Sequence, residues 1–262
     1  MKLIGDEIKY AEKCINHKRM NKKKQRKTLM VLSKYYYYHH NYDKDTIKAL
    51  LIDFLMSVKS DFKHEHLDEL IDYIINDGSP LNVVDKVCIT EDEMSIIESR
   101  ESEQEKRVLF TMLVQYKVKN SLFPTNNNKI NEEHSTIFKD ANVTCLKKDK
   151  FKIMHRLHHD GLIELSPNLN DSRITLNYVN DESPVLMEIT SYEDFIMDYY
   201  IYKGRKVIPC RKCGERLLIQ GNSRKCYCAK CKEEKQLEHQ RNSMARLRKS
   251  CSNREKNECE VL

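Results

Sequence analysis

Five cysteines fall within one short stretch, PCRKCGERLLIQGNSRKCYCAKC, which ends at Cys231. Cys210 and Cys213 form one C-x-x-C motif, and Cys228 and Cys231 form a second. Each motif can turn two thiolates toward one ion, and two such motifs complete a tetrahedral four-thiolate zinc site. A segment this short and polar cannot bury enough apolar surface to fold alone, so the metal would supply much of its folding free energy. The stretch therefore predicts a structural zinc ribbon.

Other interpretations of these cysteines are open. A disulfide needs an oxidising compartment, but the chain opens MKLIGDEIKY without an apolar signal segment, which favours the reducing cytoplasm. A redox motif is less favoured, because two C-x-x-C motifs in one ribbon suit a metal better than an exchange reaction.

Cys226 could replace Cys228 as a ligand, although Cys228 restores the C-x-x-C spacing. Gly214 follows the first motif, where a residue tolerant of positive φ is needed. Four thiolates leave no open position for water, so the predicted site is structural and not catalytic.

Charge is distributed unevenly along the 262 residues, whose net charge is +6. Lys203–Lys256 contains 17 Lys and Arg against 5 Asp and Glu, and Lys9–Lys27 contains 9 against 1. Two basic segments therefore flank an acidic middle, which suits a polyanion partner, although lysine-rich stretches are also simply solvated helix faces. No apolar run approaches the roughly 18 residues that a membrane helix requires, so no membrane association is expected.

The amino-terminal part of the chain reads as helices. Apolar residues recur at helical spacing over 6–40, which Lys22–Lys24 interrupt, and over 43–58 and 64–76. Tyr35–Tyr38 and the two histidines that follow are predicted to form an aromatic wall against the next helix and not a base-stacking platform. We expect a helical domain over residues 1–100 with no catalytic constellation.

The boundary of this domain carries its own signals. Thr90-Glu91-Asp92-Glu93 is a capping box that starts a further helix. Glu98–Arg107 is almost wholly polar, so we expect an exposed junction to a second domain over residues 101–182.

The second domain is predicted from its order of elements. A buried helix around 108–118 precedes a short helix, Ser135–Ala141, and a longer helix from about Leu146 to His159. The apolar side of the longer helix is predicted to comprise Phe151, Met154 and Leu157. Two strands, Leu162–Leu165 and Ile174–Tyr178, form a hairpin after it.

This order resembles the winged helix-turn-helix over about residues 103–180, and RLHHDGLIEL resembles the end of a recognition helix that leads into the wing. The resemblance implies that the longer helix lies in the major groove of DNA. Lys148, Lys152 and Arg156 are spaced four apart and would share one face there. Phosphate contacts would come from Lys147, Lys150 and, in the wing, Arg173. Winged helices also serve as protein-interaction modules, and that alternative stays open.

The remaining segments complete a mainly α fold. We expect a connecting strand and helix at 183–204, the zinc ribbon at 205–235 and a basic helical tail at 236–262. The tail has little apolar content and is predicted to order on phosphates. Its candidate DNA contacts are Arg241, Arg246, Arg248 and Lys249.

The whole arrangement is similar to uncharacterised proteins of low-GC Gram-positive bacteria and their phages, in which a winged helix precedes a C-terminal C-x-x-C-G…Y-C-x-x-C ribbon. This similarity implies a cytoplasmic, zinc-containing protein that binds double-stranded DNA, such as a phage or mobile-element regulator or replication factor. An adaptor that binds a protein of a transcription or replication complex is the alternative. An enzyme is disfavoured, because the sequence has no Gly-rich phosphate loop, no paired carboxylate motif on a recognisable scaffold and no open metal site.

Overall fold

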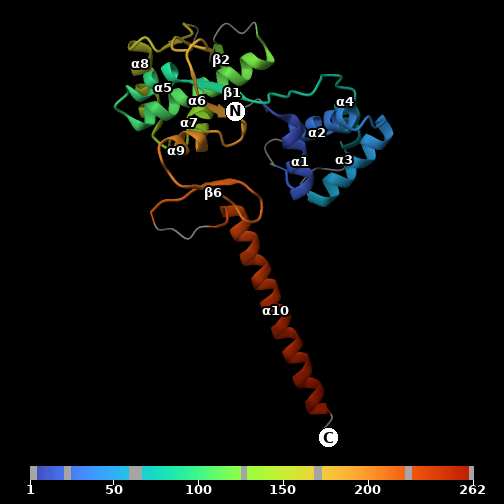
Figure 1. Cartoon of the computed structure of the whole chain (residues 1–262). Helices are drawn as coiled ribbons and strands as arrows, with labels where there is room; N and C mark the ends of the chain where they lie inside the picture. The colour runs from blue at the N-terminus through green and yellow to red at the C-terminus, as the bar shows by residue number, and fades with distance from the viewer. Residues whose placement is uncertain are drawn as a thin grey trace. The chain divides into compact units, whose positions relative to one another are not determined.

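The computed structural model describes residues 5–20, 25–58, 67–124, 129–167, 173–221 and 226–259, with side chains described as far as residue 245. The chain is mainly helical, as predicted (Figure 1). Its contacts divide it into two compact units, residues 1–199 and residues 200–262, which we describe separately. None of the helices in the described ranges combines the length and the apolarity needed to span a membrane.

Four helices form a small bundle in the amino-terminal part of the first unit. They are α1 (Glu7–His17), α2 (Gln25–Lys34), α3 (Lys44–Val58) and α4 (Leu67–Ile75). Their apolar stripes meet in one core that includes Ala11, Leu32, Leu51 and Ile71. The predicted stripes thus become the core, because each helix can bury only one face in a bundle.

Between α1 and α2 the predicted helix over 6–40 is interrupted. Lys18 takes a left-handed conformation (φ 46°) and ends α1, and Lys22–Lys24 lie outside the described residues. A five-residue π-helix, η2 (Tyr35–His39), continues α2. Tyr35 and Tyr36 are buried, whereas Tyr37 is 50% exposed. The predicted aromatic wall is therefore confirmed only for the first two tyrosines, because Tyr38 and the two histidines that follow are exposed as well.

A two-stranded sheet joins distant parts of the chain. Strand β1 (Val87–Thr90) pairs antiparallel with β5 (Val185–Ile189), with Cys88 opposite Glu188. These strands come from segments that the sequence placed in different domains. Helix α5 (Glu91–Glu98) follows β1 and opens with the predicted capping box, in which Thr90 and Glu93 each accept the backbone N–H of the other.

The middle of helix α6 (Glu103–Leu122) is shielded from solvent on all sides, because every residue from 108 to 118 is buried. A helix that is buried on all sides must be covered by other elements. One of them is α9 (Ile196–Tyr202), whose fully buried Tyr199 packs its ring 5.3 Å from that of Phe110.

The predicted exposed junction over 98–107 holds only in part, because its residues are exposed or half-buried except for one. Glu105, in the first turn of α6, is only 4% exposed. Its carboxylate pairs with Arg100 at 3.2 Å and with Arg156 at 2.7 Å. A polar stretch can enter the interior when its charges are paired, and composition alone does not reveal the partner.

The remaining elements of this unit follow α6 in the order β2 (Lys129–Asn131), α7 (His134–Asp140), α8 (Lys147–His159), β3 (Ile163–Leu165) and β4 (Arg173–Leu176). The strands form an antiparallel sheet in the order β2-β4-β3. The two helices and the hairpin lie where the sequence predicted them, but strand β2 was not predicted. It is three residues long and has one apolar residue, Ile130, so it carries no periodic signal.

The buried face of α8 differs from the predicted one. Ile153, Met154 and Leu157 are buried, whereas Phe151 is 55% exposed. The placement of Phe151 on the apolar side is therefore wrong. Ile153 occupies the inward position, and two residues along a helix correspond to about 200° of rotation.

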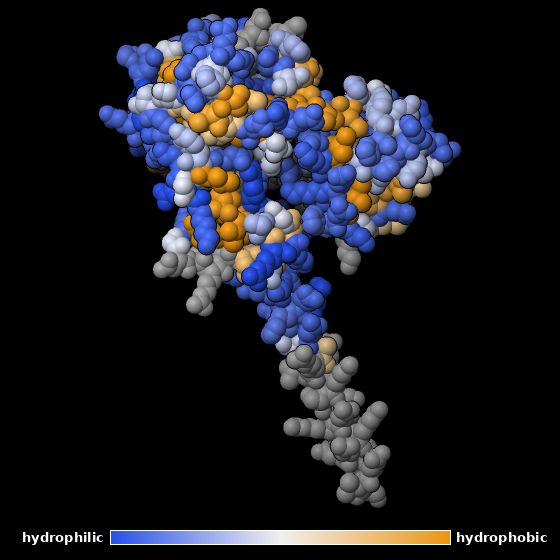
Figure 2. All heavy atoms as spheres, in the orientation of Figure 1, coloured by the Kyte–Doolittle hydropathy of each residue, from blue (hydrophilic) through white to orange (hydrophobic). Residues whose placement is uncertain are grey.

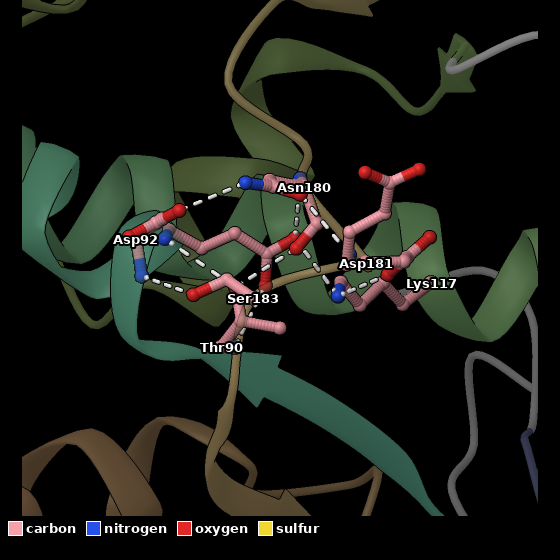
Figure 3. Close-up of polar contacts among 8 residues, drawn as sticks. Thr90, Asp92, Lys117, Asn180, Asp181 and Ser183 are labelled. Atoms are coloured by element: carbon pink, nitrogen blue, oxygen red, sulfur yellow. Dashed lines mark hydrogen bonds and ion pairs between the residues drawn. The ribbon is translucent and has the colours of Figure 1, made fainter.

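A buried polar network fastens the loop after β4 to α5 and α6 (Figure 3). The Lys117 ammonium of α6 lies 2.8 Å from the Glu93 carboxylate and 2.7 Å from that of Asp181. Glu93 is fully buried and also accepts the backbone N–H of Asn180 at 3.1 Å. The Thr90 hydroxyl donates to the Asn180 carbonyl at 2.9 Å. Because the buried charges of Lys117 and Glu93 neutralise each other, both can be taken out of water.

The second unit contains a hairpin and a long helix. Strands β6 (Val207–Pro209) and β7 (Arg216–Leu218) pair antiparallel, and α10 (Ala229–Cys259) follows. Figure 2 shows a mostly hydrophilic surface over the described part of α10, where Leu237 and Met244 are exposed exceptions.

Candidate metal centre

The four cysteines of the two C-x-x-C motifs come together in the second unit. Cys210 follows β6, and Cys213 lies in the same loop before β7. Cys228 precedes α10, and Cys231 lies in the first turn of that helix. All four side chains are buried, and their sulfur atoms all lie within 4.8 Å of one another. This cluster could hold a metal ion.

The backbone holds the thiols in place. Gly214 has a positive φ of 71° and donates its N–H to the Cys210 carbonyl at 2.9 Å, which closes the first turn. The predicted need for a residue tolerant of positive φ is confirmed here. The Cys228 N–H points at the Cys210 sulfur at 3.3 Å, and the Cys231 N–H points at the Cys228 sulfur at 3.5 Å. Both turns thus direct backbone dipoles at the sulfur atoms.

The spacing of the sulfur atoms fits a tetrahedral site. The Cys213 and Cys228 sulfurs are 3.7 Å apart. Two sulfurs that bind the same tetrahedral ion, each at about 2.3 Å, would lie about 3.8 Å apart. A disulfide would bring them to about 2.05 Å, and all four cysteines are free. The Cys213–Cys228 distance thus fits two ligands of one ion and not a disulfide.

Burial and hydrogen bonding act in opposite directions on these thiols. Burial opposes ionisation of Cys210, but N–H groups of Cys228, Cys213 and Lys212 outweigh it and lower the pKa of Cys210 to about 6. Burial dominates at Cys213 and Cys228 and raises the pKa of both. A bound cation favours the thiolate form at such positions, so buried thiols and a metal ion complement each other.

Cys226 lies outside the four-sulfur cluster. It is half-buried, and its carbonyl oxygen accepts the Arg211 N–H at 3.0 Å. The sequence left open whether Cys226 or Cys228 is the ligand. The cluster contains Cys228, which is therefore the candidate ligand.

Two further contacts tie α10 to the second turn and the hairpin. Lys235 donates to the Tyr227 hydroxyl at 3.0 Å, and Lys212 pairs with Glu234 at 2.8 Å.

Gly214→Ala is expected to weaken metal binding about fivefold to thirtyfold. An added Cβ meets no atom within 4 Å, so the cost is the strain of the left-handed backbone, about 1–2 kcal/mol. Competition against a chromophoric chelator measures the change. Gly78→Ala is the matched control, because Gly78 also has open space but no positive φ. Equal affinities of Gly214→Ala and the wild type would show that this turn does not shape the site.

The lysines predicted to contact DNA lie on α8 in different surroundings. Lys147, Lys148 and Lys152 are exposed. Within the described part of the chain, Lys148 and Lys152 form no hydrogen bond or ion pair. Lys150 is half-buried and holds its ammonium 5.5 Å from the centre of the Phe138 ring. Lys148 and Lys152 are therefore the lysines of α8 whose ammonium groups make the fewest contacts within the described part of the protein.

Arg156 does not share the surroundings of the two lysines with which the sequence grouped it. Its guanidinium donates to the buried Glu105 carboxylate at 2.7 Å, although the side chain is 55% exposed. Sequence reasoning missed Glu105, because the two residues are far apart in the chain and no periodic pattern connects them. The interaction links the ends of α6 and α8.

The other predicted DNA contacts lie elsewhere. Arg173 is exposed at the start of β4, and Arg241 is exposed on α10. The backbone of Arg246, Arg248 and Lys249 belongs to α10, but their side chains lie outside the described part of the chain.

Comparison of the chain with protein-family models, with curated proteins and with solved structures found no match to any of them.

Proposed function

We propose that this chain is a zinc-containing protein that binds double-stranded DNA and acts as a regulator or replication factor, not as an enzyme. The observation that carries the proposal is the outward face of α8. Lys148 and Lys152 are exposed there without internal partners, and the opposite face is anchored by Ile153, Met154 and Leu157. A firmly packed helix that presents unpaired cations is suited to a polyanion.

The elements around α8 support a winged helix-turn-helix. Helices α7 and α8 are followed by the β3–β4 hairpin, and β2 completes the sheet. In this class of fold the second helix enters the major groove, while the preceding helix crosses the backbone. The hairpin would be the wing, and Arg173 at the start of β4 would contact phosphate there.

Zinc is the ion that best suits the four cysteines. Tetrahedral sites of four sulfurs take zinc or iron–sulfur centres, and zinc serves where the role is structural. When bound, zinc would link the β6–β7 hairpin to the start of α10 through four metal–sulfur bonds. Cys210 and Cys213 would hold it on one side, and Cys228 and Cys231 on the other. The basic tail that follows, including the exposed Arg241, would then contact the DNA backbone.

The proposal predicts binding that depends strongly on salt. For about four phosphate contacts, affinity for a mixed-sequence duplex is expected to fall about a hundredfold between 50 and 200 mM salt, because each contact releases condensed counterions. Fluorescence anisotropy of a labelled duplex measures this slope. Affinity that does not change over this range would contradict a contact dominated by phosphates.

A charge reversal on α8 tests whether this helix provides the contact. Lys152→Glu is expected to weaken DNA binding about tenfold or more, because a carboxylate would face the negatively charged duplex. Lys44→Glu in the amino-terminal bundle makes the same change in net charge at an exposed position of another helix, α3. Equal losses in the two variants would mean that net charge alone, and not α8, determines the affinity.

A further inference from the structure

An exposed aromatic ring stands on the outward part of α8. Phe151 is 55% exposed. The buried residues Ile153 and Leu157 lie on the far side of the helix, whereas the buried Met154, three residues along, lies on the adjoining face. At helical spacing its neighbours are Lys147, Lys148 and His155. The Lys147 ammonium lies 5.8 Å from the centre of the ring. Phe151 thus places a large apolar surface in water within a group of basic side chains.

The charges around Phe151 identify the partner that would cover it. A ring surrounded by lysines suits a surface that is strongly negative and offers a local apolar group. In the major groove of DNA, the 5-methyl group of thymine is the apolar feature that proteins read, and phenylalanine is among the side chains that contact it. A phosphate at the edge of the groove would meet Lys147, and Lys148 and Lys152 would lie within the groove.

We infer that Phe151 determines sequence specificity by packing against the 5-methyl group of a thymine in the bound site. This inference rests on the proposed binding of α8 in the major groove. Lysines next to Phe151 would fix the register of α8 on the backbone, and the ring would then distinguish thymine from the other bases. An acidic protein surface would also satisfy the lysines, but it would not depend on a methyl group of DNA.

The test removes the 5-methyl group of thymine and changes nothing else. A preferred site is first selected from a random-sequence duplex library with the full-length, metal-loaded protein. Each thymine of that site is then replaced by deoxyuridine, which keeps the base pairing and lacks the methyl. Loss of one buried methyl corresponds to about a fourfold loss of affinity. We expect this loss for the wild type at one or two thymines.

The variants ask whether Phe151 is the residue that senses the methyl. Phe151→Ala is expected to bind the thymine and deoxyuridine sites equally, while Phe151→Leu keeps part of the difference. Because Phe151 is more than half exposed, both variants should retain the wild-type melting temperature. Phe123→Ala is the matched control, since Phe123 is 51% exposed and follows the last residue of α6. This variant should discriminate like the wild type.

The possible results separate the inference from the proposed function. If the wild type binds duplexes with a strong salt dependence but ignores the methyl at every position, the inference fails and the proposed DNA binding stands. If Phe151→Ala still discriminates thymine from deoxyuridine, another residue reads the methyl and the inference also fails. If no duplex binds with a salt-dependent affinity, both fail. Retention of an acidic protein partner by the wild type but not by Phe151→Ala, without any methyl effect, would assign this face to a protein.

Discussion

Replacement of Cys231 by serine is expected to release the metal and unfold the β6–β7 hairpin with the start of α10. The hairpin strands are three residues each, and the buried cluster around them consists mainly of the four cysteines. The metal would therefore supply most of the folding free energy, which for structural zinc sites is about 10–16 kcal/mol. Elemental analysis of the purified chain should fall from about one zinc per chain to near none.

The control for this experiment is Cys226→Ser. Cys226 lies in the same stretch but outside the four-sulfur cluster, so its variant should keep the full metal content. Limited proteolysis gives a second readout, because cleavage between residues 205 and 235 should appear in Cys231→Ser and not in Cys226→Ser. A Cys231→Ser protein that keeps one ion, or a Cys226→Ser protein that loses it, would overturn the assignment of ligands.

Lys117→Met is expected to destabilise the first unit by about 3–5 kcal/mol. The substitution removes the cation that faces the Glu93 carboxylate, which is fully buried, and leaves that charge without a counterion. Methionine has a similar length, so the loss reports the charge and not a cavity. Urea denaturation followed by circular dichroism measures the change in the free energy of unfolding.

Two further variants separate the buried pair from ordinary surface effects. Lys86 pairs with Glu188 at 2.6 Å, but both side chains are about half exposed, so Lys86→Met should leave the urea midpoint almost unchanged. Adding Glu93→Gln to Lys117→Met removes the unpaired charge and should recover stability relative to Lys117→Met alone. A Lys117→Met protein as stable as the wild type would show that the ion pair makes no net contribution.

The features that could be predicted from the sequence are those written in nearby residues. The two C-x-x-C motifs predicted the four-sulfur cluster, since each pair needs only one local turn. The capping box at Thr90 involves residues three apart, and the apolar stripes of α3 and α4 repeat within each helix. The capping box and the apolar stripes each lie within a single element, and the two cysteine pairs lie within one short stretch, so no distant part of the chain was needed.

The features that were missed depend on contacts between distant segments. The pairing of β1 with β5 joins Cys88 to Glu188, and neither short strand indicates its partner. The ion pair of Arg156 depends on Glu105, which lies at the start of α6. Phe151 looked like a core residue because it is apolar, but Ile153 occupies the inward position. Tertiary structure decides which of several apolar residues is buried and which of several charged residues is paired.

The position of Cys231 within α10 couples the metal centre to the helix itself. A helix must close its first turn before it can grow, and this step is unfavourable by a factor on the order of 1,000. An ion held by Cys228 and Cys231, which are three residues apart at the start of α10, would keep that turn closed. The 31-residue helix would then elongate from a preformed nucleus, so the supply of zinc would govern how much of the basic segment is helical.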